Sequence, residues 1–485
     1  MPVFASTPID RHWLATLCLL IATLPCAARV AAQTPAAADA PVASASLTLD
    51  QARGIGVAAL REGDPQLALQ IGHGLLQADA RDAFAHYLIA SAHQQMRQTG
   101  DGRRAAARAY RHADTPTEKF QAAQLAARLS VNDERMTLAQ IWLRRSIIHA
   151  PDPAFRPQIE ADYRQVRAMN PLEFNLRLSM APSSNVNNGS DSPYALIDGV
   201  PVVGILDGLS QALSGMTASA DLALSYRLHR AENSETRATA RLHAARVWLS
   251  RKARDLLNST PGSDVSNSDF ASTTVEAGLR HAFRPGGAEG NGIVSAELAT
   301  GQFWYGGRAY QSYARIGVGR ALRLTDTTHL SLGAQVERRE FDNSRNRPID
   351  TLALQGTLSH RLGNGDRIGV TLAWRDSDSD TLNAVSTRKA AYLQYDMAEG
   401  LGPARLSFTL GAAQTDFPDY RVGFIVVPGG RGDDSVFASL DMLFQRFDYA
   451  GFAPSLTLRA QKTRSNVSRF EATEFAVAFG IRSSF

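Results

Sequence analysis

The fold is decided by residues 470–485, which read FEATEFAVAFGIRSSF. Apolar side chains recur at every second position near the end of this stretch, at Phe475, Val477, Phe479, Ile481 and finally Phe485. Small or polar residues lie between most of them, which predicts a strand with one lipid-facing side and one side facing a polar lumen. A soluble strand with one buried face alternates in the same way, so the prediction depends on how many such strands follow one another.

Thirteen similar segments precede this one. From Glu173 onward, alternation with a period of two residues replaces helical spacing, and Gly, Asn, Asp and Pro separate the segments. The predicted strands are 174–183, 217–229, 235–249, 270–283, 293–305, 310–322, 329–341, 351–362, 367–377, 387–397, 404–417, 435–447, 452–463 and 470–485. Because single-chain bacterial barrels have an even number of strands, we predict a 14-stranded antiparallel outer-membrane β-barrel over residues 170–485.

The connections between these strands alternate in length. Short ones at 231–234, 363–366 and 448–451 interleave with long ones at 184–216, 251–269 and 418–434. Outer-membrane barrels have short turns on the periplasmic side and long loops outside the cell. The segment that precedes the first strand is therefore predicted to lie in the periplasm.

That preceding segment, residues 47–169, has the composition and spacing of helices, and about seven are predicted. A weak repeat pairs an aspartate with a small residue four positions later: Asp64 with Ala68, Asp101 with Ala105, and Asp133 with Thr137. Its period brackets that of tetratricopeptide repeats. Turns are predicted at 63–65, 100–102, 115–116, 132–133 and 151–153. Stacked helical hairpins expose a concave face that holds a polypeptide; a helical plug or spacer is the alternative.

Residues 1–32 are predicted to be an export signal, with Arg11 before an apolar run and Ala31-Ala32 before the cleavage position. An Ala/Pro-rich linker follows at 33–46. Cys18 and Cys26 are the only cysteines, so the mature chain is expected to lack disulfides. A lipoprotein signal at Cys26 is the alternative, although the proline before it does not suit that processing.

Alternation also predicts which charged side chains face the lumen. The inward set carries both signs: Arg177, Asp221, Glu276, Arg280, Glu297, Arg315, Glu337, Arg339, Arg375, Asp396, Asp441 and Arg459. Ion pairs across a polar lumen are the expected arrangement, and a dedicated substrate path is the alternative.

Catalytic and cofactor chemistry is not predicted. No histidine has the spacing of a zinc helix or belongs to a defensible Ser/His constellation, so we expect no enzyme activity, metal or cofactor. A membrane lipase, with Ser and His from different strands, stays an open alternative. The net charge of +4 is small for 485 residues and does not indicate nucleic acid as a partner.

Short motifs at the two ends of the barrel resemble the surface lipoprotein assembly modulator family, the outer-membrane component of the type XI secretion system. Asn170-Pro171 leads into the first strand, and Pro182, Asn185 and Asn187 follow it. Before the closing strand come Pro454 and then Ser465-Asn466. The order of export signal, helical repeats and barrel is also similar to that family.

The resemblance implies an outer-membrane translocon that delivers particular lipoproteins or secreted proteins from the periplasm to the cell surface. It implies a client lipoprotein or secreted protein as partner, and a periplasmic chaperone as a further one. A barrel of this kind also implies outer-membrane lipid and the barrel assembly machinery. A polysaccharide exporter and a passive porin with a helical module are the alternatives.

Overall fold

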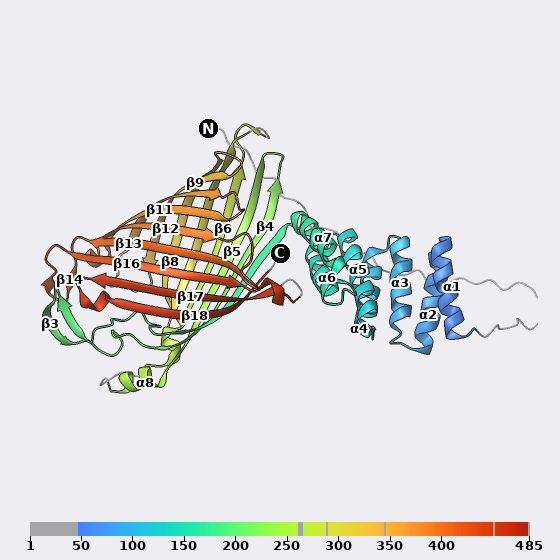
Figure 1. Cartoon of the computed structure of the whole chain (residues 1–485), viewed down its shortest axis with the longest axis horizontal. Coiled ribbons are helices and arrows are strands. Elements are labelled where there is room, and N and C mark those ends of the chain that lie inside the picture. The colour runs from blue at the N-terminus through green and yellow to red at the C-terminus, as the bar shows by residue number, and fades with distance from the viewer. Residues whose placement is uncertain (1–46, 260–264, 288–289, 344–345, 450–451, 484–485) are drawn as a thin grey trace, which may run out of the picture. The chain divides into compact units, whose positions relative to one another are not determined.

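The structure, a computed structural model, describes residues 47–485 apart from 260–264, 288–289, 344–345, 450–451 and 484–485. The predicted export signal, the whole of the predicted linker, both cysteines and Phe485 lie outside the described residues. In the described part, helices come first and the barrel strands follow, as the colours from blue to red show in Figure 1.

Seven α-helices fill the stretch between Leu49 and Met169. They are α1 (Leu49–Glu62), α2 (Pro65–Ala78), α3 (Ala83–Gln95), α4 (Thr99–His112), α5 (Pro116–Asn132), α6 (Met136–Ile148) and α7 (Arg156–Met169). The side chains of Asp64, Asp82 and Thr115 accept hydrogen bonds from backbone N–H groups of the first turns of α2, α3 and α5. Among the described helices, none is both long and apolar enough to cross a bilayer.

Small side chains let these helices pack closely. Ala68 and Ala105, the small residues of the predicted repeat, are buried, together with Leu88, Leu125 and Leu129. At Gly72, an added Cβ would lie 2.6 Å from Cγ1 of Ile89 on α3, so α2 and α3 approach too closely there for a side chain. Successive helices pack against each other, as the prediction of stacked hairpins requires.

The predicted turn at 100–102 is wrong, because these residues lie inside α4. The chain reverses earlier, at Met96–Gln98, where Arg97 has a φ of 58°. Gly102 serves packing instead: an added Cβ would lie 3.1 Å from the Cβ of His93 and 3.2 Å from the carbonyl oxygen of Ala90. The glycine therefore marks a close contact between α3 and α4.

Fourteen antiparallel strands close into a barrel, which confirms the predicted fold. They are β1 (Leu172–Ser183), β4 (Gly215–Arg230), β5 (Ser234–Leu249), β6 (Ser272–Phe283), β7 (Gly292–Tyr305), β8 (Arg308–Arg323), β9 (Thr328–Phe341), β10 (Ile349–Arg361), β11 (Arg367–Asp378), β12 (Ser386–Asp396), β13 (Arg405–Phe417), β16 (Arg431–Leu443), β17 (Phe452–Ser465) and β18 (Ala472–Ser483). Each strand pairs with its neighbours along the barrel, and β18 returns to pair with β1.

The long connections contain structure that the sequence pattern did not predict. The first one holds the hairpin β2 (Tyr194–Ile197) and β3 (Val200–Ile205), the second holds α8 (Arg251–Asn258), and another holds β14 (Arg421–Val422) and β15 (Ile425–Val426). These elements are too short to give a periodic signal. All three connections leave the barrel at the end where β1 finishes, and short turns such as 231–233 lie at the other end.

The outer face of the barrel is apolar and uncovered. Leu176, Leu178 and Met180 on β1 are exposed, as are Phe475, Phe479 and Ile481 on β18. A closed barrel satisfies its backbone amides between strands, and an apolar outer face of this kind belongs in hydrocarbon. The chain is therefore an outer-membrane protein, with the helical part on the periplasmic side, where β1 begins.

The lipid-facing and lumen-facing sides of one strand should respond differently to the same substitution. Leu410 on β13 is exposed on the outer face, and Thr409 lines the lumen. We expect Leu410→Arg to lower the free energy of unfolding by about 2–4 kcal/mol, because an arginine would enter hydrocarbon. Thr409→Arg, the matched control, should cost much less. Urea titration of the protein refolded into lipid vesicles measures both, and equal losses would contradict the assigned faces.

Candidate functional site

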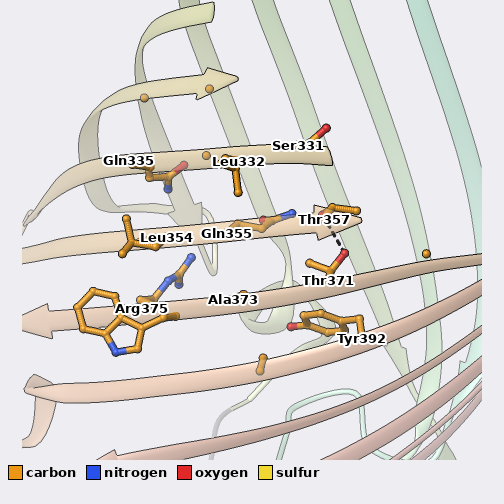
Figure 2. A pocket seen from close by; sticks show the side chains of 18 of the residues that line it. Ser331, Leu332, Gln335, Leu354, Gln355, Thr357, Thr371, Ala373, Arg375 and Tyr392 are labelled. Atoms are coloured by element: carbon orange, nitrogen blue, oxygen red, sulfur yellow. Dashed lines mark hydrogen bonds between the residues drawn. The ribbon is translucent and has the colours of Figure 1, made fainter. Parts of the chain in front are cut away.

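The barrel encloses a cavity of about 1070 Å³, lined by residues of β6 to β13. Figure 2 shows part of its wall, where Gln335, Gln355, Thr357, Thr371 and Arg375 come from the successive strands β9, β10 and β11. The hydroxyl oxygens of Thr357 and Thr371 lie 2.9 Å apart and share a hydrogen bond. The wall thus offers amide and hydroxyl groups at every second residue, a spacing that follows from the period of the strands.

Three of the six predicted acidic residues meet on one side of this cavity, around Arg315 of β8. The Arg315 guanidinium lies 3.1 Å from a carboxylate oxygen of Glu276, 3.1 Å from one of Glu297 and 3.8 Å from one of Glu337. Arg339 pairs with Glu337 at 2.6 Å. The hydroxyl of Tyr313 donates to Glu276 at 2.7 Å. Neighbouring strands therefore combine three carboxylates and two guanidinium groups into one network on this wall.

Two further pairs involve predicted lumen residues. Asp221 on β4 pairs with Arg241 of β5 at 2.7 Å and lies opposite Arg177 in the strand register. Asp441 on β16 pairs with Arg482 of β18 at 2.6 Å. Sequence reasoning missed both arginine partners, although each lies at an inward position of the alternation.

The remaining predicted lumen residues have other surroundings. Arg459 donates to the side-chain oxygen of Gln461 at 3.1 Å, and Arg280 lies opposite Glu297 in the register. Asp396 lines the cavity and accepts from Gln394 at 2.9 Å. Arg375 lines the cavity opposite Arg388 on β12, a residue that the predicted set did not include. Mixed charge signs were predicted, but the structure distributes them unevenly around the wall.

The junction between β1 and β18 closes the barrel, and we call it the seam. On its other side, β1 pairs with β4 from Leu172 to Ser183, along its whole length. With β18, the pairs run only from Leu178 to Ser183, opposite Ile481 to Ala476. Continuing this register, the first half of β1 leads to residues 482–485, of which 484–485 lie outside the described residues. This half lies toward the periplasm.

The outer end of the seam is held together by loops. The Ser190 hydroxyl, in the connection after β1, donates to the carbonyl oxygen of Ser468, between β17 and β18, at 2.6 Å. The backbone N–H of Asp191 donates to the carbonyl oxygen of Glu471 at 2.8 Å. These hydrogen bonds cross the seam beyond the last paired residues. Loop hydrogen bonds therefore fasten the outer end of the seam.

The asparagines of the barrel motifs shape these loops. Asn185 closes a small loop by donating to the carbonyl oxygen of Gly189 at 2.7 Å and accepting from its N–H at 2.8 Å. Asn187 donates to the carbonyl oxygens of Leu209 and Gln211 at 2.9 and 2.8 Å. The hydrogen bonds of Asn187 thus join the two ends of the connection between β1 and β4.

On the β18 side of the seam, the Asn466 side chain also forms hydrogen bonds with loop backbone. It accepts from the N–H of Gly432 at 3.0 Å and donates to the carbonyl oxygen of Gly430 at 2.9 Å. The preceding Ser465 accepts from the N–H of Val467 at 3.1 Å. These contacts order the backbone that the loop hydrogen bonds across the seam use.

Prolines of the same motifs lie in or next to paired strands. Pro182 on β1 is opposite Met216 of β4, and Pro454 on β17 is opposite Ile481 of β18. Because proline has no N–H, it removes one donor from a ladder. Asn170 is buried at the end of α7; it accepts from the N–H of Leu172 at 3.0 Å and donates to the hydroxyl of Thr137 at 3.1 Å. Asn170-Pro171 thus fixes the exit from the last helix into β1.

Two histidines in the helical part have unusual environments. His86 on α3 is buried, and its ring stacks on that of His112 with centroids 5.5 Å apart. Burial lowers the pKa of His86, and the nearby His112 and Arg108 act in the same direction. Burial also lowers the pKa of His149, whose Nε2 lies 3.1 Å from the hydroxyl of Tyr110. Both rings are held in the neutral form.

Within the described ranges, no group of three or more His, Cys, Asp and Glu side chains has an arrangement that would hold a metal ion. The site is therefore defined by the charged lumen, the seam and the helices before it. These features define a class: an outer-membrane β-barrel preceded by a module of stacked helical hairpins.

Comparison with known families gives one match. Residues 264–480 match the family described as surface lipoprotein assembly modifier, which confirms the resemblance predicted from the sequence. Among curated proteins, no match was found.

Solved structures are similar to separate parts of the chain. OmpT of Vibrio cholerae, in the trimer form, has 11% identity, covers 64% of this chain and 98% of its own, and has a TM-score of 0.34. A BenF-like porin from Pseudomonas fluorescens has 10% identity, the same two coverages and a TM-score of 0.34. The Yersinia enterocolitica type III secretion chaperone SycD, in complex with a peptide of the translocator YopD, has 16% identity, covers 25% of this chain and 95% of its own, and has a TM-score of 0.23.

The helical part should lose stability in mild acid. The unfolded chain takes up protons at His86 near the ordinary pKa of about 6.5, while the folded chain resists protonation. Stability due to this residue is therefore complete above about pH 6.5 and falls as the pH drops below it. The helical signal at 222 nm should melt at a lower temperature at pH 5.5 than at pH 7.5.

The control variant for this measurement is His86→Gln, which removes one titrating ring. Its melting temperature should depend less on pH over the same range, with the remaining dependence due in part to His149. An unchanged pH dependence in this variant would contradict the assignment to His86.

Proposed function

We propose that this protein moves client lipoproteins or secreted proteins from the periplasm to the cell surface, without an enzymatic step. The observation that carries the proposal is the match of residues 264–480 to the surface lipoprotein assembly modifier family, in a barrel closed by a seam between β1 and β18. We further propose residues 1–32 as export signal, 33–46 as linker, 47–169 as the periplasmic domain and 170–485 as the barrel.

The seam suits a lipidated client for a physical reason. Acyl chains are apolar and stay in hydrocarbon, whereas the attached polypeptide is polar and needs a polar path. A lateral opening between Leu172–Arg177 and the end of β18 would let the polypeptide enter the lumen while its acyl chains remain in the bilayer. The loop hydrogen bonds at Ser190 and Asp191 would keep the outer end of the barrel closed meanwhile.

The lumen favours an extended polypeptide over a folded domain. Its cavity of about 1070 Å³ is far smaller than a folded domain. The polar wall at Gln335, Gln355 and Thr371 supplies hydrogen-bonding groups for a passing backbone. The stacked helices before β1 would hold the client at the periplasmic entrance, since stacked hairpins present a concave binding face.

A polysaccharide exporter is the second candidate function, and one observation favours it. Arg375 and Arg388 place two positive charges side by side on the wall of the cavity. The carboxylates of Glu276, Glu297 and Glu337 around the same lumen oppose it, because they would repel an acidic polymer. In a passive porin, the helical repeats would have no function.

Locking the seam tests lateral opening. In the variant Met180→Cys with Phe479→Cys, the two positions are register partners on β1 and β18, close enough for a disulfide. The control, Ala438→Cys with Ala460→Cys, places the same bond between β16 and β17. A candidate lipoprotein is expressed in the same cells, and protease treatment of whole cells measures its surface exposure.

The oxidised seam variant should lose most surface exposure of the client, and a reducing agent should restore it. The control disulfide should have no effect, because that junction does not open. Unchanged export with a formed seam disulfide would contradict lateral release.

Deleting the helices tests the periplasmic role. Removal of residues 47–168 should leave a folded barrel in the outer membrane but abolish surface delivery, because the client would no longer be captured. Heat-modified gel migration checks the barrel, and whole-cell protease treatment checks delivery. If delivery and solute flux both stay unchanged, the helical domain has no part in transport. That outcome would support the alternative of a passive porin.

A further inference from the structure

An arginine pair on the wall of the lumen has an unusual arrangement. Arg375 of β11 and Arg388 of β12 are direct register partners, and both line the cavity. Like charges directly opposite each other destabilise a pair of strands unless something neutralises them. Figure 2 shows Arg375 on the same stretch of wall as Gln355 and Tyr392.

No carboxylate pairs with either guanidinium in the part of the chain that the structure describes. The register neighbour of Arg375 on β10 is Ala353, and that of Arg388 on β13 is Thr415, whose hydroxyl accepts from Arg388 at 3.2 Å. The next inward residue in this row, Asp433, pairs with Arg431 at 2.8 Å. The barrel therefore leaves the two positive charges for a ligand.

We propose that Arg375 and Arg388 form a binding site for acidic side chains of an extended polypeptide inside the lumen. This inference rests on the proposed function and specifies the chemistry of the client segment. A guanidinium pairs with a carboxylate through parallel hydrogen bonds, and two guanidinium groups on neighbouring strands can hold one or two carboxylates. The amide groups of Gln335 and Gln355 line the same cavity and can bind the backbone beside them.

The rest of the lumen favours a peptide over a uniform polyanion. The carboxylate oxygens of Glu297 lie on the same cavity, and Glu276 and Glu337 meet at the same arginine, Arg315. A polymer with a negative charge on every unit would meet repulsion there. A polypeptide can present acidic residues to the arginine pair and neutral or basic residues to this acidic wall.

The test measures peptide binding to the full chain in detergent micelles by fluorescence anisotropy. The probe is a labelled ten-residue peptide of alternating Glu and Ser, and its neutral counterpart has Gln in place of Glu. The test variant is Arg375→Gln with Arg388→Gln. The control variant is Arg459→Gln, which changes an inward arginine that already donates to Gln461. Heat-modified gel migration confirms that each variant is a folded barrel.

The acidic peptide should bind about tenfold or more tightly than the neutral one, since one charged hydrogen bond accounts for a factor of this size. The double variant should lose this preference, and Arg459→Gln should keep it. Equal binding of the two peptides, or an unaffected double variant, would overturn the proposal.

Two competing ligands distinguish a peptide site from a site for other negatively charged molecules. If oligogalacturonate binds more tightly than the acidic peptide, the site belongs to a polysaccharide and the proposal is wrong. If inorganic phosphate displaces the peptide at equal concentration, the site takes free anions and the proposal is also wrong. Because binding is measured without export, failure here leaves the seam experiment intact. Conversely, peptide binding with unchanged export in the locked seam would remove only lateral release.

Discussion

The whole structure depends on the requirement that backbone amides in hydrocarbon find partners within the barrel. Thirteen of the junctions meet this requirement between strands that follow one another among the barrel strands, and the last joins β1 to β18. In the described residues that closing junction pairs Leu178–Ser183 of β1 with Ala476–Ile481 of β18. The barrel is therefore closed by pairing between its first and last strands.

Loops compensate at one end of this junction. Asn185 and Asn187 order the connection after β1, and Asn466 orders the turn before β18. Between them, the hydrogen bond from Ser190 to Ser468 crosses the seam. The loops therefore fasten the outer end of the barrel.

Sequence periodicity was sufficient to predict the strands and most helices, because alternation and helical spacing are local properties. It failed at Gly100–Gly102, where glycine serves a close contact between α3 and α4 and not a turn. It also missed the hairpin of β2 and β3, whose strands are too short to show a period. Alternation alone predicted the lumen side for Arg280, Glu297 and Arg375, and these three residues line the cavity.

The sequence by itself determined that this chain is a 14-stranded barrel behind stacked helices, because both follow from spacing along the chain. Only the tertiary structure decided which charges meet. Arg315 gathers Glu276, Glu297 and Glu337 because strand register places β6 to β9 side by side. The same register leaves Arg375 facing Arg388, since pairing between strands depends on stagger, which a single strand does not encode.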